Sequence, residues 1–478
     1  MAIKHGVYVN ERATSVSTPI HADVGVPFVI GTAPYWMSAL WESRNTYSAD
    51  PYEVPMILTS WDDYVDKYGH SEETDEYGHF KYTLCEFAYS HFKLYGCQPV
   101  IFYSIAPATK TVNDEKHTVN ARKILLPVSA GGTITVKNAS NTVPSADYSV
   151  YYTESNLVIE VKSTSTAASA SELSVSYTQY SYNEKTAADI ASGMGAIDAC
   201  MSELGVIPDL ICAPGFSHDS TVAALMATKA AALNGCFSAK ALIDTADSVT
   251  TYGDVYTWKN ENNIVDENQI VCWPKVGLGD KVFHMSTQLA GLMALVDAGN
   301  GNPYESPSNK NFKMDRLVVG NGVTYRMTKE QADILNGNGV VTAINMLSSG
   351  WVCWGNYTAC YPGNSDVKDY FISVSRMFDY VANTLIRTFW AKLDKPMNRR
   401  LIDNIVDSVN IWLNGLVGAG YLLGGRVEFN EKENPLTDLM AGIIRCHIYI
   451  TPPSPAQEID FTLEYDVSYL EALFRTEE

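Results

Sequence analysis

The sequence has few positive charges. Its 478 residues carry 34 Lys and Arg against 54 Asp and Glu, which gives a formal net charge of −20. Because nucleic-acid binding needs a concentrated positive field, this balance argues against nucleic acid as the main partner. Only 18% of the residues are charged while 46% are hydrophobic, a globular composition with a weakly charged surface. A chain of this length predicts about three domains.

Metal-binding and disulfide patterns are also missing. The nine cysteines include no CxxC pair and their number is odd, and no signal peptide follows Met1. We therefore expect free, mostly buried thiols in a reducing compartment. The nine histidines form no HxH or HxxxH pair, so no metal is expected. Residues 334–365 carry no charge, but Asn, Gly and Ser interrupt them too often for a membrane span.

No catalytic or nucleotide-binding motif is complete. Ser217, His218 and Asp219 are adjacent, but consecutive side chains point apart and catalytic triads come from distant positions. This tripeptide is better interpreted as a loop that ends in a helix cap. Gly-Asn-Gly clusters begin at Gly299, Gly320 and Gly337. None completes a phosphate-binding loop, so they are interpreted as hairpin turns. Neither catalytic nor cofactor-binding residues are predicted.

Both ends of the chain are predicted to be strands on linkers. Residues 5–11 form a short apolar strand, and the polar tract 12–21 follows it. Near the other end, apolar and polar residues alternate from Ile459 to Ser468, which is typical of a strand with one buried face. The segment 451–458 before it contains three prolines and cannot be part of a ladder. A strand so near a chain end must pair upstream or with another molecule.

The residues between the two ends fall into segments with different hydrophobic patterns. Residues 106–183 contain short alternating runs separated by turn residues, which predicts an inserted β-sandwich or barrel. Strands alternate with helices over 184–345, which predicts a mostly parallel sheet covered by helices. Two long amphipathic helices are predicted at 367–393 and 397–417, separated at Pro396.

A basic cluster stands out in this acidic chain. It comprises Arg387, Lys392, Lys395, Arg399 and Arg400, and Asp394 alone opposes it within 14 residues. The cluster is either a solvated helix face or a positive stripe that meets an acidic partner.

Several stretches, in this order along the chain, resemble the contractile tail sheath family of phages and related injection machines. They are Gly6–Glu11 (the family's PGVYVEE), Val26–Ala33, Asp209–Gly215, Leu335–Gly355 (its LN…GIN…G…WG stretch), Arg376–Tyr380 and Pro452–Glu458 (its PxxPAE turn). The sequence departs from the pattern where His5 replaces a proline and Gln457 interrupts Pro-Ala-Glu.

The resemblance implies an α+β multidomain fold. An α/β domain of subtilisin-like topology would carry the inserted small β-sandwich, and a C-terminal α+β domain would follow with strand-exchanging terminal arms. The expected divisions are an N-terminal arm (1–22), the first part of the core (23–105), an outward-facing sandwich (106–183), the α/β domain (184–345), an inner domain with tube-facing helices (346–455) and a C-terminal arm (456–478).

The resemblance also implies a function without enzymatic activity. The chain would be a structural subunit that polymerises helically around a tail tube and contracts to drive the tube through the target cell envelope. Strand exchange would involve Val7, Tyr8, Val9, Ile459, Phe461, Leu463 and Tyr465, and the tube would face Lys392, Lys395, Arg399 and Arg400.

The expected partners are further copies of the chain, the tail tube protein, and baseplate and tail terminator proteins. Nucleic acid, cofactors and direct membrane insertion are not expected. The particle would be a virion tail or a phage-tail-like particle assembled in the bacterial host cytoplasm. Two alternatives remain, an α/β hydrolase that uses Ser217 or His218 and a non-contractile tail or baseplate protein.

Overall fold

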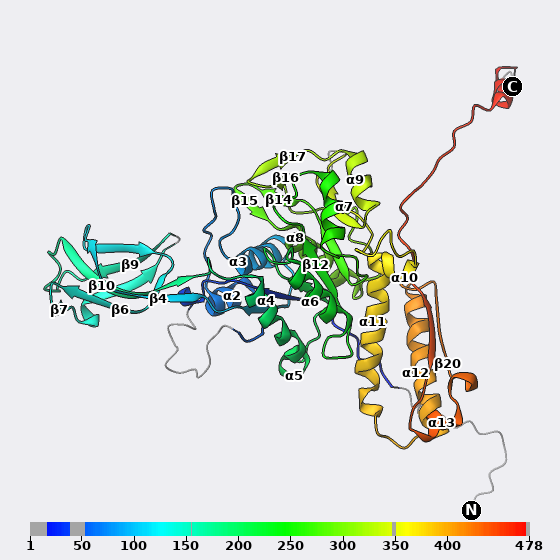
Figure 1. Cartoon of the computed structure of the whole chain (residues 1–478). Coiled ribbons are helices and arrows are strands. Elements are labelled where there is room, and N and C mark those ends of the chain that lie inside the picture. The colour runs from blue at the N-terminus through cyan, green and yellow to red at the C-terminus, as the bar shows by residue number, and fades with distance from the viewer. Residues whose placement is uncertain (1–16, 39–52, 154, 347–349, 475–478) are drawn as a thin grey trace, which may run out of the picture.

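The computed structural model describes residues 17–38, 53–153, 155–346 and 350–474, with side chains to 470. A central body carries a β-rich lobe on one side and a pair of long helices on the other (Figure 1). The last described residues run away from the body as a single extended segment (Figure 1).

The body is built on an eight-stranded sheet. Its strands are, in spatial order, β19 (Val352–Trp354), β18 (Val340–Ile344), β13 (Gln269–Cys272), β12 (Lys240–Asp244), β11 (Leu210–Cys212), β1 (Pro27–Gly31), β3 (Val100–Ser104) and β2 (Met56–Leu58). The inner pairings are parallel, while the two edge strands β19 and β2 pair antiparallel. One sheet therefore unites strands from three predicted segments, and the boundary expected at residue 345 falls within the β18–β19 pair.

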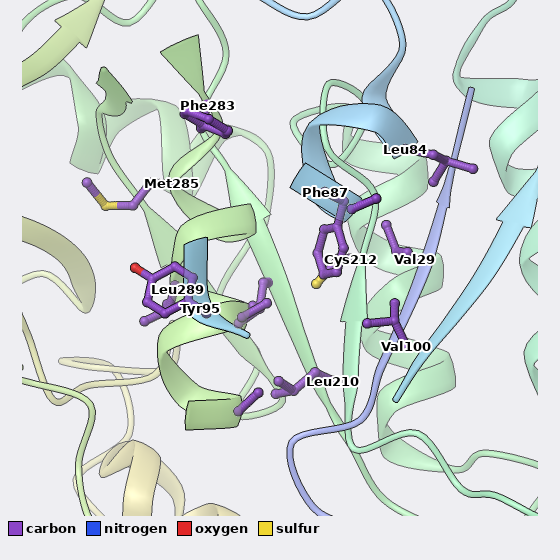
Figure 2. Close-up of a cluster of buried hydrophobic side chains, with 14 of the residues drawn as sticks. Val29, Leu84, Phe87, Tyr95, Val100, Leu210, Cys212, Phe283, Met285 and Leu289 are labelled. Carbon is purple, nitrogen blue, oxygen red and sulfur yellow. The ribbon is translucent and has the colours of Figure 1, made fainter. Parts of the chain in front are cut away.

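Each inner strand is buried on both faces because helices cover the sheet on two sides. In β1 the Val29 side chain enters one core, while Phe28 and Ile30 enter the other, as the two-residue period of a strand requires. The first core includes side chains of α3 (Thr83–Ala88) and α8 (Met285–Asn300), such as Phe87 and Leu289 (Figure 2). The second core includes side chains of α4 (Ala187–Gly193) and α6 (Ser220–Ala231).

A second, four-stranded antiparallel sheet lies in the body beside the first. Its order is β15 (Lys281–Phe283), β14 (Lys275–Leu278), β16 (Arg316–Val319) and β17 (Val323–Tyr325). Two helices that the sequence predicted at least in part, α7 (Tyr252–Glu261) and α9 (Lys329–Asn336), complete this part of the body.

The lobe is the inserted segment, and it has two antiparallel sheets with one core between them. One sheet has the order β4 (Ala108–Thr118), β10 (Glu172–Ser181), β6 (Ala130–Asn138) and β7 (Asn141–Thr142), and the other β5 (Lys123–Pro127), β9 (Asn156–Val161) and β8 (Tyr148–Tyr152). The predicted strands in this segment all fall on observed ones. Strand β4 was missed because its mostly polar residues are largely exposed and show no apolar alternation.

An aromatic contact fastens the lobe to the body. Trp36, in the short helix η1 (Tyr35–Met37), stacks on Tyr180 with ring centroids 4.6 Å apart. Its indole Nε1 donates to the Val128 carbonyl at 2.9 Å. Because both partners lie within the inserted segment, this buried side chain ties the lobe to the body.

Several helical segments are interrupted. Residues 187–204 are divided into α4, a 3-10 stretch η5 (Met194–Ala199) and α5 (Cys200–Leu204). Helix α3 continues as a π-helix, η3 (Tyr89–Tyr95). The helix predicted over 367–393 breaks at Phe371, whose extended backbone separates α10 (Val367–Tyr370) from α11 (Ile372–Phe389). Ser60 caps α2 (Trp61–Tyr68) by accepting from the Asp63 amide.

The C-terminal part is a helix pair covered by a hairpin. Helices α11 and α12 (Arg399–Gly418) share a core with the hairpin strands β20 (Gly424–Glu428) and β21 (His447–Thr451). A short helix, α13 (Leu436–Met440), lies in the connection between those strands. None of the helices in the described ranges has the length and apolarity that crossing a membrane requires.

Candidate functional site

The described part of the C-terminal arm, residues 456–474, presents a row of large apolar side chains to solvent. Ile459 is 70% exposed, Phe461 85%, Leu463 95% and Tyr465 79%. Burying such a side chain stabilises a protein by about 1.5–3 kcal/mol, so a surface that covers all four would gain several kcal/mol. None of the residues that the structure describes forms such a surface.

The strand predicted over 459–468 is not a strand in the isolated chain. Residues 452–466 pair with no strand in the described part of the chain, and a short 3-10 helix, η8 (Val467–Phe474), begins before the predicted strand would end. The alternating pattern is present, but a strand needs a neighbour to accept its backbone hydrogen bonds. The alternating pattern alone does not predict whether the same chain supplies that neighbouring strand.

The root of this arm is held against the body. Pro452 is buried, and the Tyr357 hydroxyl donates to Gln457 Oε1 at 2.5 Å. Tyr357 in turn stacks on Tyr361 with ring centroids 4.1 Å apart. The arm therefore leaves the molecule from a fixed point and in a direction away from the body (Figure 1).

At the other end, the predicted exchange residues Val7, Tyr8 and Val9 lie outside the described residues. The described segment that follows, Ser17–Ala22, lies along α11 and α12 and is here called the strap. Its amides donate to hydroxyl groups of the helices: Ile20 to Thr388 at 2.9 Å, Ala22 to Thr384 at 3.0 Å and Ser17 to Ser408 at 2.7 Å. Residues 17–21 of the predicted linker are therefore bound to the helix pair.

A buried charge cluster ties the helix pair to the central sheet. The Arg376 guanidinium, 3% exposed, contacts Asp297 through two nitrogens at 3.1 and 2.5 Å and Asp209 at 2.7 Å. Asp209 also accepts from the amides of Gly25 and Val26, directly after the strap. Burial raises the pKa of Asp297 to about 6, against the influence of Arg376. The sequence analysis gave these residues no role, because they lie far apart in the chain.

The predicted tube-facing residues come together in the turn between α11 and α12. Lys395, Arg399 and Arg400 are exposed and Lys392 is partly exposed. Arg399 forms an ion pair with Asp403 at 2.8 Å. Arg387 does not belong to this surface, since it points back to Asp23 of the N-terminal segment at 2.8 Å.

Apolar side chains accompany these charges. Trp390 is 62% exposed, Leu393 61% and Met397 39%. The turn is therefore a basic surface with an apolar centre, which the charge pattern alone did not reveal. Exposed aromatic residues together with Arg are typical of the energetic centre of protein interfaces.

The tripeptide at 217–219 is not arranged as a catalytic triad. The Ser217 side chain is fully buried, and its hydroxyl donates to the Asp244 carboxylate at 3.3 Å. Asp219 caps α6 by accepting from the amides of Thr221 and Val222, as the cap interpretation predicted. In the described part of the chain no hydrogen bond joins Ser217 to His218, and no group of three or more side chains is suited to hold a metal ion.

Comparison with known proteins identifies the C-terminal region. Residues 365–466, which contain α11, α12, the hairpin and most of the arm, match the family model described as the phage tail sheath C-terminal domain. The chain is also 26% identical over 365 residues to the tail sheath protein of Burkholderia phage BcepMu, covering 71% of this chain and 75% of that one. It is 26% identical to the tail sheath protein of Escherichia phage P2, over 58% of this chain and 68% of that one. The chain is therefore similar to contractile tail sheath proteins from several phages.

Solved structures of sheath-family assemblies share the fold. The helical sheath of the anti-feeding prophage in its contracted state is similar with a TM-score of 0.60 at 15% identity, over 98% of this chain and 100% of that one. The contracted sheath complex of an extracellular contractile injection system, PVC, is similar with a TM-score of 0.59 at 16% identity, over 98% and 99%. The mixed α/β, multi-sheet architecture is thus similar to that of these sheath structures.

Proposed function

We propose that the chain is the structural subunit of a contractile tail sheath. It polymerises helically around a tail tube and contracts to drive the tube through the envelope of a target cell. The observation that supports this proposal most is the C-terminal arm, whose alternating apolar side chains are exposed. The arm belongs to a C-terminal region that matches the family model of the phage tail sheath C-terminal domain. An apolar face that none of the described residues covers is typical of a surface that binds another molecule.

Strand exchange between subunits provides that cover. The arm residues Ile459, Phe461, Leu463 and Tyr465, and at the other end Val7, Tyr8 and Val9, add strands to the sheets of neighbouring copies. Each backbone hydrogen bond gained contributes about 0.5–1.5 kcal/mol net, and side-chain alternation sets the register. The links persist while the bodies move, so the sheath contracts from a metastable extended state without falling apart.

The basic turn formed by Lys392, Lys395, Arg399 and Arg400 faces the tube. Its charges suit an acidic tube surface, and exposed Trp390 and Leu393 add apolar contact area. Baseplate and tail terminator proteins lie at the two ends of the polymer. The polymer is part of a virion tail or tail-like particle that is assembled in the host cytoplasm.

The proposed function also implies a division of the chain into domains. Segments 23–105 and 184–345 form an α/β domain of subtilisin-like topology, and 106–183 forms an outward-facing β-sandwich. Residues 346–455 form the inner domain, while 1–22 and 456–478 are the arms. The outward position of the sandwich is supported by its place on the side of the body away from α11 and α12 (Figure 1).

Electron microscopy tests the proposal directly. Negative-stain images of the purified full chain should contain hollow striated cylinders. Removing residues 459–478 should leave a folded monomer that forms none, because the exchanged strand is gone. Removing only residues 475–478 is the matched control and should leave cylinders intact. Normal cylinders from the chain without residues 459–478 would contradict the proposal.

A further inference from the structure

An amine, a carboxamide and a carboxyl group meet where the helix pair docks on the central sheet. Lys240 begins β12, Asn268 directly precedes β13, and Asp379 lies in α11. The register pairs Ala241 with Gln269, so Lys240 and Asn268 lie side by side at the same end of two neighbouring parallel strands. The sheet therefore holds the amine beside the carboxamide, and α11 adds the carboxyl group.

The Lys240 amine contacts both of the other groups. Its Nζ donates to Asn268 Oδ1 at 2.9 Å and lies 3.0 Å from Asp379 Oδ2. Because the C=O bond adds only about 1.2 Å, the amide carbon Cγ of Asn268 lies within about 4.1 Å of the same nitrogen. Reaction requires an approach of roughly 3–3.5 Å, and groups held this close to that distance react far faster than separate molecules.

The three side chains are largely shielded from water. The Lys240 side chain is 1% exposed and that of Asp379 20%, while Asn268 is 9% exposed. Burial raises the pKa of Asp379, against the influence of Lys240. A carboxyl group with a raised pKa is suited to accept a proton from an ammonium group, and a buried lysine that has lost its proton is a nucleophile.

The Asp379 carboxylate has an oxygen available for this proton. Its Oδ2 is close to Nζ but outside hydrogen-bonding geometry, and no other group in the described part of the chain bonds to it. Buried polar atoms are nearly always hydrogen-bonded, so this atom needs an explanation beyond a structural ion pair. A second buried lysine, Lys259, shows the contrast. It donates to the backbone carbonyls of Asn338 at 2.7 Å and Tyr361 at 3.0 Å, which are purely structural partners.

We propose that Lys240 and Asn268 form an intramolecular isopeptide bond, with Asp379 as the proton acceptor, so that β12 and β13 are joined covalently. The Lys240 ammonium passes one proton to Asp379, and the neutral amine attacks Asn268 Cγ. The new C–N bond forms as the bond from Cγ to Nδ2 breaks. A second proton of the amine passes to Nδ2, which leaves as ammonia, and the third stays on the new amide nitrogen. The reaction needs no oxidant, reductant or further reactant.

The leaving ammonia has space beside the carboxyl group. A small cavity lined by Asp379, Asp209, Ser238 and Asn383 has room for about one water-sized molecule, and ammonia is of that size. Once the ammonia has left, the shielding of the site from water protects the new bond from hydrolysis.

The bond forms only in the folded chain. Lys240 and Asn268 are 28 positions apart in the sequence, and Asp379 belongs to a helix that must first dock on the sheet. The bond closes a loop that contains α7, and it prevents β12 and β13 from separating. This inference goes beyond the proposed function, because it concerns the single chain and does not depend on polymerisation.

Mass spectrometry of the full-length protein tests the bond. Most molecules should be lighter than the sequence mass by one ammonia, about 17 Da. Trypsin should not cleave after the modified Lys240, so the segment 230–259 should be recovered joined to the segment 260–275. A full sequence mass, with 230–240 and 260–275 recovered as separate peptides, would overturn the inference.

Variants assign the chemistry to these residues. Lys240→Met removes the amine and Asp379→Asn removes the proton acceptor, so the loss of ammonia should be absent from both. Lys259→Met is the matched control at a buried lysine, and it should retain the loss. An ammonia loss that persists in Lys240→Met would come from cyclisation of an asparagine alone and would also overturn the inference. If a variant does not fold, the peptide map of the unaltered protein decides, because a covalent bond survives denaturation.

Discussion

Replacing Arg376 by Met tests how the helix pair is attached to the body. Methionine keeps most of the side-chain length but removes the guanidinium that contacts Asp297 and Asp209. Asp209 retains the amides of Gly25 and Val26, whereas Asp297 is fully buried and loses its charged partner. Breaking a buried pair in this way costs about 3–5 kcal/mol. We expect a loss of this size in the free energy of unfolding, measured by urea denaturation of the monomer with far-UV circular dichroism.

The pH dependence of the stability loss shows whether the buried charge of Asp297 causes it. Burial already raises the pKa of Asp297 to about 6, and removing Arg376 raises this pKa further because its charge opposes the effect. A carboxyl group with a raised folded-state pKa takes up its proton in the folded state first, so stability increases as the pH falls through that pKa. The loss caused by Arg376→Met should therefore be larger at pH 8 than at pH 5.

Two controls separate this explanation from general damage. Adding Asp297→Asn to Arg376→Met should recover at least about 2 kcal/mol, because the buried charge is gone. Arg399→Met, at a side chain that is 79% exposed, should leave stability unchanged. A loss below about 1 kcal/mol for Arg376→Met, with no recovery in the double variant, would show that the cluster does not hold the helix pair.

Two further predictions concern the strap and the basic turn. Thr388→Val removes the acceptor for the Ile20 amide and should cost about 0.5–1.5 kcal/mol. It should also speed hydrogen exchange in the strap, measured by mass spectrometry, and unchanged exchange would mean that these bonds do not hold it. Reversing Lys392, Lys395, Arg399 and Arg400 to Glu should keep the circular dichroism spectrum and melting temperature but stop assembly on tubes. Normal co-sedimentation of this variant with tubes would remove the proposed tube contact.

Local periodicity explains why much of the fold could be predicted. The strands of the central sheet other than β2, the helices α6, α8 and α12 and the alternating pattern of the arm all follow from apolar spacing along a few consecutive residues. Apolar spacing did not predict strand β4, because its residues are mostly polar. It also did not predict the end of helix α10, because Phe371 adopts an extended conformation inside a longer apolar pattern.

The sequence by itself predicted strand-like patterns at both ends of this chain and an apolar face at one of them. Only the tertiary structure decided that none of the described residues covers this apolar face. It also decided that Arg376 joins carboxylates far away in the sequence. The physical reason is the range of the forces: secondary structure follows from neighbours a few positions apart. Burial, edge access and ion pairing depend instead on where distant segments meet in space.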